Sequence, residues 1–224
     1  MGLTDWLSTG KKILSALTGG PALTESEAYV PQGSPKPRPV EPAAKAGNVA
    51  GGDGRWVADG RKLTPHISLL EMTRTDHADL QEENRRVTDD EVARLTETAR
   101  LVEVCRDILG TAIDVHSGKR GAALNARVGG SDKSQHLRCE ACDFSPAGPD
   151  TEQSIEAAFT LLWEAARGGK LRGFGQLIVE NQATGRERRS YWLHISLGSP
   201  HRNPARCGEV LRMVNGNYSL VGKV

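Results

Sequence analysis

The chain has 224 residues, with 29 lysines and arginines against 28 aspartates and glutamates, and only 4% aromatic residues. This length is enough for one or two domains with a substantial core. Nearly balanced charge and few aromatic side chains argue against a basic, base-stacking surface, so we expect no nucleic-acid partner.

Membrane insertion and export are also disfavoured. No apolar run approaches the ~20 residues that cross a bilayer, so we expect no transmembrane segment. Lys11 and Lys12 precede a short apolar run, but Gly19, Gly20 and Pro21 end it early, so there is no clear signal peptide.

The first quarter of the chain differs in composition from the rest. Residues 1–18 predict one short amphipathic helix that can act as an anchor. Residues 19–61 are rich in proline, glycine and alanine and predict a linker. Together they would form an extended N-terminal arm in front of a folded domain over residues 62–224.

Two helices are predicted in the folded domain. The first begins at Thr88, followed by three acidic residues, and ends at Gly110. A short strand over 112–116 and a loop-rich stretch over 117–130 follow. The second helix covers 151–166, with a capping box offered by Asp150 and Gln153.

The last third of the chain predicts two hairpins. Strands over 174–180 and 190–196 flank a bend at Gly185, and strands over 210–214 and 218–221 flank Asn215–Gly216. Helices precede these strands, so we expect an α+β fold: a small antiparallel sheet with helices packed on one side.

Three side chains are candidate metal ligands. Side chains alternate along a strand, so His194 points to one face of its strand, and Asp143 shares a face with Cys139. If both faces look into one cleft on the sheet, His136 in the preceding turn can complete the set. Two histidines and one aspartate can hold a catalytic zinc and leave one coordination position for water.

Several motifs, in order, resemble one family. From Leu63 to about Ser196 the chain resembles the zinc D-Ala-D-Ala carboxypeptidase and peptidoglycan endopeptidase family. Members of this family are phage and bacterial metallopeptidases. The motifs that carry the resemblance are Leu63–Glu71, Ser117–Arg120, Leu124–Ser131, Ser134–His136, Gln176–Glu180 and Trp192–Ser196.

The resemblance implies a site. The family's zinc ligands fall on His136, Asp143 and His194. Arg120 would act in catalysis and substrate binding by holding a peptide carboxylate or carbonyl oxygen, a task that suits a guanidinium that stays charged. Ser134 would orient the ligand turn beside the substrate.

The general base departs from the family pattern. Many relatives carry an acid or a histidine two or three residues before the last ligand, where this chain has Tyr191 and Trp192. Glu180 is the remaining candidate to take a proton from water and return it to the leaving amine.

The expected hairpin register works against Glu180. With the bend centred on Gly185, Gln176 would pair with His194, and Glu180 would lie about 13 Å further along the strand at ~3.3 Å per residue. Gln176 would then be a neighbour that orients water or substrate.

Two cysteines add further alternatives. The family usually has glycine at the position of Cys139, and strand alternation points Cys139 toward the metal. There it would be a bystander, crowd the site, or compete as a thiolate ligand. The spacing to Cys142 also fits a redox pair or a zinc knuckle, although alternation sends the two sulfurs to opposite faces.

The resemblance implies a zinc-dependent peptidase that cleaves D-amino-acid-containing stem peptides of bacterial peptidoglycan. It would be phage-encoded, as a lysis enzyme or a virion-associated wall-degrading protein. It would be made in the host cytoplasm and act at the cell wall or periplasm, or be carried in a virion. The alternative is a structural tail or capsid component with a weakly active or inactive peptidase-like module, docked to a virion or other protein through residues 1–20.

Overall fold

The computed structural model describes residues 54–184, 189–198 and 204–224. The predicted N-terminal helix and most of the predicted linker lie outside these residues. The described helical elements are α2 (Leu69–Met72), η1 (Ala78–Leu80), α3 (Gln81–Asn84), α4 (Asp89–Leu109), α5 (Ala122–Arg127), η2 (Gln135–Arg138), α6 (Glu152–Arg167) and η3 (Pro204–Arg206). The strands are β1 (Trp56–Val57), β2 (Arg86–Val87), β3 (Ile113–Ser117), β4 (Ala141–Pro146), β5 (Phe174–Ala183), β6 (Arg189–Leu197), β7 (Glu209–Val214) and β8 (Asn217–Lys223).

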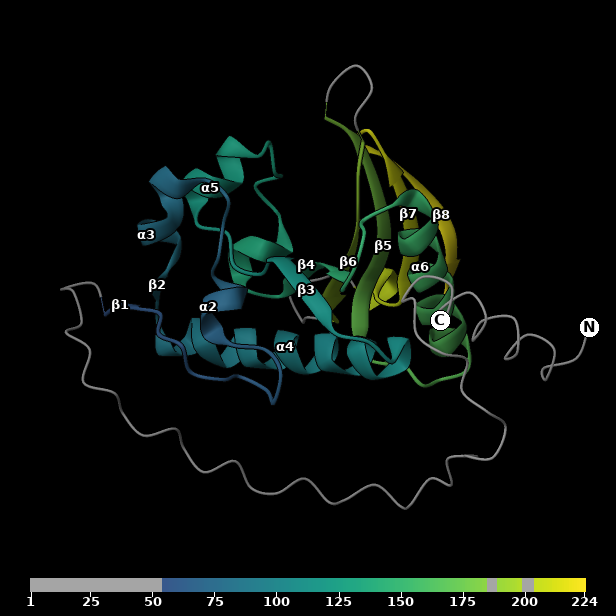
Figure 1. Cartoon of the computed structure of the whole chain (residues 1–224), viewed down its shortest axis with the longest axis horizontal. Coiled ribbons are helices and arrows are strands. Elements are labelled where there is room, and N and C mark those ends of the chain that lie inside the picture. Colours follow the sequence, from purple (N-terminus) through teal and green to yellow (C-terminus); the bar gives the residue numbers. More distant parts are fainter. Residues whose placement is uncertain (1–53, 185–188, 199–203) are drawn as a thin grey trace, which may run out of the picture. The chain divides into compact units, whose positions relative to one another are not determined.

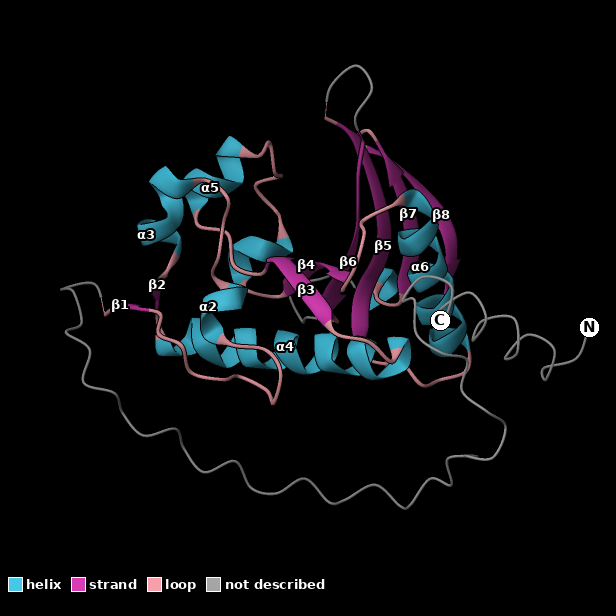
Figure 2. Cartoon of the chain, in the orientation of Figure 1, coloured by secondary structure: helices cyan, strands magenta, loops and turns pink. Residues whose placement is uncertain are grey.

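A six-stranded sheet with the strand order β3-β4-β6-β5-β7-β8 organises the domain (Figure 1). Neighbouring strands are antiparallel except β5 and β7, which are parallel because the chain passes across one end of β5 between β6 and β7. The α+β class is confirmed (Figure 2). The parallel pair is a departure from the wholly antiparallel sheet that we expected.

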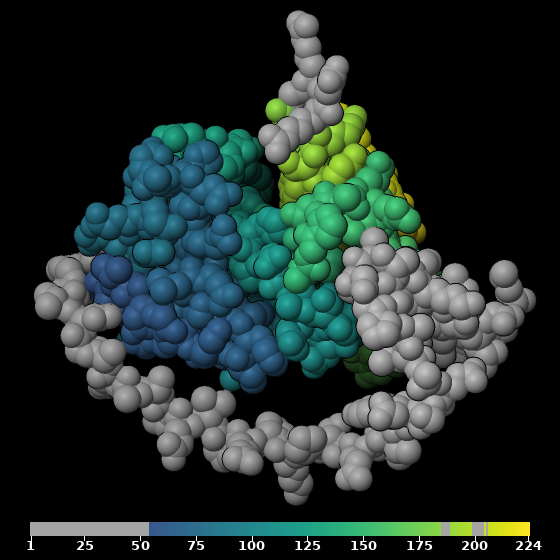
Figure 3. Space-filling view, viewed as in Figure 1, coloured from purple at the N-terminus to yellow at the C-terminus, as the bar shows by residue number. Residues whose placement is uncertain are grey.

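Helices α4 and α6 pack on one face of the sheet. Strand residues of that face, among them Phe144, Leu177, Leu193 and Ile195, are completely buried in one apolar cluster with residues of both helices. Side chains of the alternate strand residues, among them Asp143 and His194, project from the opposite face. In the space-filling view, the surface is notched between the blue-to-teal part of the chain and the green-to-yellow part (Figure 3).

The predicted start and stop of α4 are confirmed. The Thr88 hydroxyl accepts from the Glu91 amide, the Glu91 carboxylate accepts from the Thr88 amide, and Gly110 ends the helix at φ +66°.

The predicted capping box of α6 was wrong by one residue. Thr151 is the residue with extended backbone before the first turn, so its hydroxyl caps the amide of Ser154. Asp150 lies one residue too early to reach an unpaired amide of the first turn.

The domain begins earlier than Lys62. Strand β1 pairs with β2, and the Trp56 indole donates to the Asp89 carboxylate at the start of α4 (3.0 Å). Ala58, just after β1, is buried and belongs to the core cluster. Part of the range predicted as linker therefore packs on the domain. None of the described helices is long and apolar enough to cross a membrane.

The register of the β5–β6 hairpin differs from the expected one. Ile178, not Gln176, pairs with His194, and the pairing continues to Ala183 and Arg189. The connection is therefore centred near position 186 rather than on Gly185. The shift of two residues places Glu180 directly opposite Trp192. In the second hairpin, Asn215 (φ +50°) and Gly216 (φ +80°) form the predicted tight turn.

Phe144 tests the packing between the sheet and its helices. Phe144→Ala should lower the free energy of unfolding by about 3–5 kcal/mol, because a large cavity opens beneath α4 and α6. Denaturant unfolding measures this loss. Val128→Ala, at a side chain that is 46% exposed, should change stability by less than ~0.5 kcal/mol. Equal effects of the two substitutions would contradict the assigned core.

Candidate metal centre

Three buried donor atoms converge on the sheet face opposite the helices. His136 Nε2 lies 3.2 Å from Asp143 Oδ1 and 3.3 Å from His194 Nδ1, and His194 Nδ1 lies 2.8 Å from Asp143 Oδ1. Among the residues that the structure describes, these three form the group that could hold a metal ion. The sequence prediction that they meet is confirmed.

The spacing of these donors fits zinc. Zinc bonds to histidine nitrogen and carboxylate oxygen are about 2.0–2.2 Å long, so tetrahedral donors lie roughly 3.4 Å apart. The observed separations of 2.8–3.3 Å are close to this value. Three protein ligands with this chemistry are typical of a catalytic zinc site, which keeps one position open.

Strand pairing positions two of the ligands. Asp143 on β4 and His194 on β6 are directly paired, so their side chains project from the same face of the sheet. His136 comes from η2, a single turn that enters just before β4. Neighbours Cys142 and Phe144 project to the opposite face, into the core.

A backbone carbonyl orients His136. Its Nδ1–H donates to the carbonyl oxygen of Gly118 (2.7 Å), which leaves Nε2 unprotonated and pointing at Asp143 and His194. Second hydrogen bonds of this kind set the tautomer of a metal-binding histidine. The role of Gly118 was not predicted from the sequence, because it depends on the approach of two loops.

Arg120 holds the other oxygen of Asp143. Its Nη2 donates to Asp143 Oδ2, and its Nε donates to Ser117 Oγ (3.0 Å). Oδ1 thus remains for the two histidines. The backbone amide of Arg120 also donates to the His136 carbonyl (3.1 Å), which ties the loop to the ligand turn.

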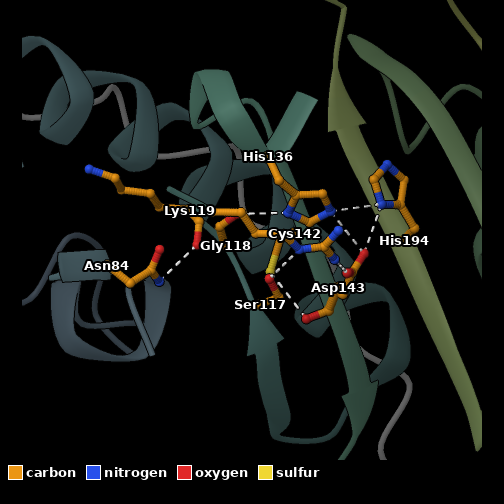
Figure 4. A network of polar contacts seen from close by, with 9 residues as sticks. Asn84, Ser117, Gly118, Lys119, His136, Cys142, Asp143 and His194 are labelled. Carbon is orange, nitrogen blue, oxygen red and sulfur yellow. Dashed lines mark hydrogen bonds and ion pairs between the residues drawn. The ribbon is translucent and has the colours of Figure 1, made fainter. Parts of the chain in front are cut away.

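The loop over residues 117–121 is fixed by Asn84 (Figure 4). The buried Asn84 amide donates to the carbonyls of Thr73 (2.9 Å) and Lys119 (3.1 Å), and its oxygen accepts from the Gly121 amide (2.8 Å). The Lys119 ammonium is itself buried and pairs with Glu91 (2.9 Å). These contacts hold Gly118 and Arg120 in front of the metal ligands.

Charges in the cluster favour the ligand states that metals need. Burial alone would raise the pKa of Asp143, but His136, His194 and Arg120 outweigh it and hold that pKa well below its usual range. Burial lowers the pKa of His136; the nearby charge of Asp143 opposes this shift and that of Arg120 adds to it, and the net shift is downward. The carboxylate is therefore ionised and the imidazole neutral at pH 7.

Glu180 lies on the same face, near the cluster. Its partner Trp192 is two residues from His194, so Glu180 and His194 are diagonal neighbours, about 7–8 Å apart rather than 13 Å. Burial raises the pKa of Glu180 to about 7, Asp143 adds to this rise, and His194 and Arg120 oppose it.

Two other predicted site residues, Gln176 and Ser134, do not make the contacts that the sequence predicted. The Gln176 amide donates to Glu209 on β7 (3.4 Å), so the structure does not bring it to His194. Ser134 begins η2 through its backbone, which accepts from the Leu137 amide (3.2 Å), and its hydroxyl makes no capping bond there.

The prediction that Cys139 points toward the metal was wrong. Cys139 ends η2 with a left-handed backbone, φ +60°, so strand alternation does not extend to it. Its side chain and that of Cys142 are buried in the core with the helices. Burial raises the pKa of Cys139 to about 12 and that of Cys142 well above its usual value, which disfavours a thiolate ligand. Both cysteines are free.

The left-handed backbone also explains why glycine suits this position, because glycine adopts positive φ without steric cost.

Residues 71–179 match the family model described as Peptidase M15. This range includes Arg120, His136 and Asp143, whereas Glu180 and His194 follow it. No curated protein matches the chain.

Gly118 tests the orientation of His136. A Cβ at Gly118 would lie 2.5 Å from the Met72 carbonyl oxygen, so Gly118→Ala must displace the carbonyl that accepts the hydrogen bond from His136 Nδ1–H. We expect zinc affinity to fall about 10–100-fold. Competition with a chromophoric chelator measures it.

Gly121→Ala is the matched control in the same loop. Its added methyl would meet only ordinary contacts at 3.7 Å or more, so affinity should be unchanged. Unchanged affinity in Gly118→Ala would show that this carbonyl does not orient the ligand.

Proposed function

Residues 71–179 place the chain in the peptidase M15 family, of zinc D-Ala-D-Ala carboxypeptidase type, and on this premise we propose a specific activity. The protein is a zinc-dependent peptidase that cleaves D-amino-acid-containing stem peptides of bacterial peptidoglycan. The observation that carries the proposal is the convergence of His136, Asp143 and His194 beside Arg120, because it completes the ligand set beyond the matched range.

The ligand triad would hold the zinc. When bound, the ion supplies Lewis-acid polarisation of the scissile carbonyl and activation of a water molecule. Asp143 brings the negative charge that offsets part of the charge of the cation, and the imidazoles of His136 and His194 complete the donor set. The buried location keeps the site away from bulk water, which strengthens these interactions.

Arg120 would serve both the protein and the substrate. One of its N–H groups holds Asp143 Oδ2 and another holds Ser117, while the guanidinium has five N–H donors in total. The remaining donors can bind a carboxylate or carbonyl oxygen of the peptide. The side chain is 18% exposed, so it can meet both partners.

Glu180 would move the proton. A carboxyl group with a pKa near 7 can take a proton from water and return it to the leaving amine at neutral pH. A bound dication would lower this pKa and favour the base form at the start of the reaction. Its diagonal placement beside His194 supports this role.

We also propose that the protein is phage-encoded and acts at the cell wall, as a lysis enzyme or a virion-associated wall-degrading protein. The resemblance of its motifs to phage and bacterial enzymes supports this origin. Docking to a virion protein through residues 1–20 would let a virion carry the enzyme to the cell wall.

Metal removal tests the proposed activity. The purified chain should bind about one zinc and cleave muropeptides, as followed by mass spectrometry, and a chelator should stop cleavage until zinc is restored. His136→Ala should lose both zinc and activity. His66→Ala changes an exposed histidine outside the ligand set, so this variant should keep both. Full cleavage by metal-free protein would refute the proposal.

Glu180→Gln tests the proton transfer. The amide keeps the shape of the side chain but cannot accept the proton, so kcat should fall at least ~10²-fold while zinc content stays at one per chain. The control is Glu97→Gln on the exposed face of α4, which should have full activity. Near-normal kcat in Glu180→Gln would assign the base elsewhere.

A further inference from the structure

Two rows of side chains cross the sheet on the face that carries the metal ligands. Strand pairing defines both rows, because directly paired residues project to the same side. The first row is Asp143, His194, Ile178, Leu211 and Leu220, and the second is Trp192, Glu180, Met213 and Tyr218. Both rows end on β8. This strand lies at the edge of the sheet (Figure 1).

The rows change from buried to exposed along their length. Ile178, Leu211 and Met213 form a small apolar cluster with Trp192, separate from the core beneath the helices. At the edge, Tyr218 is 60% exposed and Leu220 is 66% exposed. The exposed apolar side chains of the two rows therefore lie on β8, and the apolar side chains between them and the metal ligands are buried.

Charge is confined to the metal end of the rows. The acidic members of the two rows are Asp143 and Glu180, and the members on β7 and β8 are uncharged. The pKa of the Tyr218 phenol is raised by partial burial and then by the charges of Glu180 and Asp143, which agrees with its position on this face.

The exposed pair lies within reach of a bound peptide. Three strand spacings separate His194 from Leu220, about 14 Å at ~4.8 Å each. An extended peptide covers roughly 3.3–3.6 Å per residue, so about four residues would bridge this distance. Exposed apolar side chains on an edge strand favour unwanted pairing with other chains. Contact with a ligand would explain why such side chains are present here.

We propose that Tyr218 and Leu220 form a remote subsite that binds an uncharged, apolar segment of the substrate peptide, about four residues from the cleaved bond. This subsite rests on the proposed peptidase function. It would favour long peptides over short ones that reach only the metal ligands and Arg120.

Substrate length and strand face provide the test. Full-length zinc-loaded protein would be assayed with a D-Ala-D-Ala dipeptide and with a pentapeptide that ends in the same dipeptide, comparing wild type with Tyr218→Ser and Leu220→Ser. We expect KM for the pentapeptide to rise about tenfold, because burial of such side chains contributes free energy of that order. KM for the dipeptide, kcat and zinc content should not change.

The strand supplies its own control. Val221 is 43% exposed and adjacent to Leu220 but projects to the opposite face, so Val221→Ser should behave as wild type. Tyr218→Phe and Leu220→Met should restore the pentapeptide KM because they keep the apolar contact. An unchanged pentapeptide KM, or an equal rise for both peptides, would overturn the subsite. A rise seen only when the peptide carries its sugar would also overturn it, since the occupant would then be the glycan.

Binding separates this proposal from the catalytic one. If wild type cleaves neither peptide, the proposed function fails, and calorimetric titration with the pentapeptide still tests the subsite. Tenfold weaker binding in Leu220→Ser than in Val221→Ser would support it, and equal or undetectable binding in all proteins would overturn it.

Discussion

The buried carboxylate of Asp143 is the group on which the site depends. One oxygen faces His136 and His194, and the other is held by Arg120. An ionised carboxylate in a protein interior is costly unless charges and hydrogen bonds compensate it, and here three side chains do so. The same negative charge that requires these partners gives the site its attraction for a dication.

The surrounding structure keeps that arrangement in place. Pairing of β4 with β6 sets Asp143 beside His194, and the loop over 117–121 delivers Gly118 and Arg120 from the other side. Asn84 braces this loop through three hydrogen bonds to backbone groups. The helices pack on the opposite face of the sheet, where Cys142 and Phe144 are buried.

Much of this could be predicted from the sequence, and the misses have physical causes. Caps and glycine stops located α4, Asn215–Gly216 located the last hairpin, and the spacing and resemblance identified the three ligands. The predicted register of β5 and β6 was wrong because the sequence of their connection carries no strong turn signal that would define its centre. The error of two residues placed Glu180 too far from His194. Cys139 was misplaced because its left-handed backbone interrupts strand alternation. Gly118 and Asn84 act through contacts between distant segments, which no local pattern reveals.

The most direct test is a crystal structure of the zinc-loaded protein with anomalous diffraction recorded on both sides of the zinc absorption edge. The account predicts one ion per chain, bound by His136 Nε2, Asp143 Oδ1 and His194 Nδ1, with Arg120 still on Asp143 Oδ2. An ion bound elsewhere, for example at Cys139 and Cys142, or no ion at saturating zinc, would contradict it.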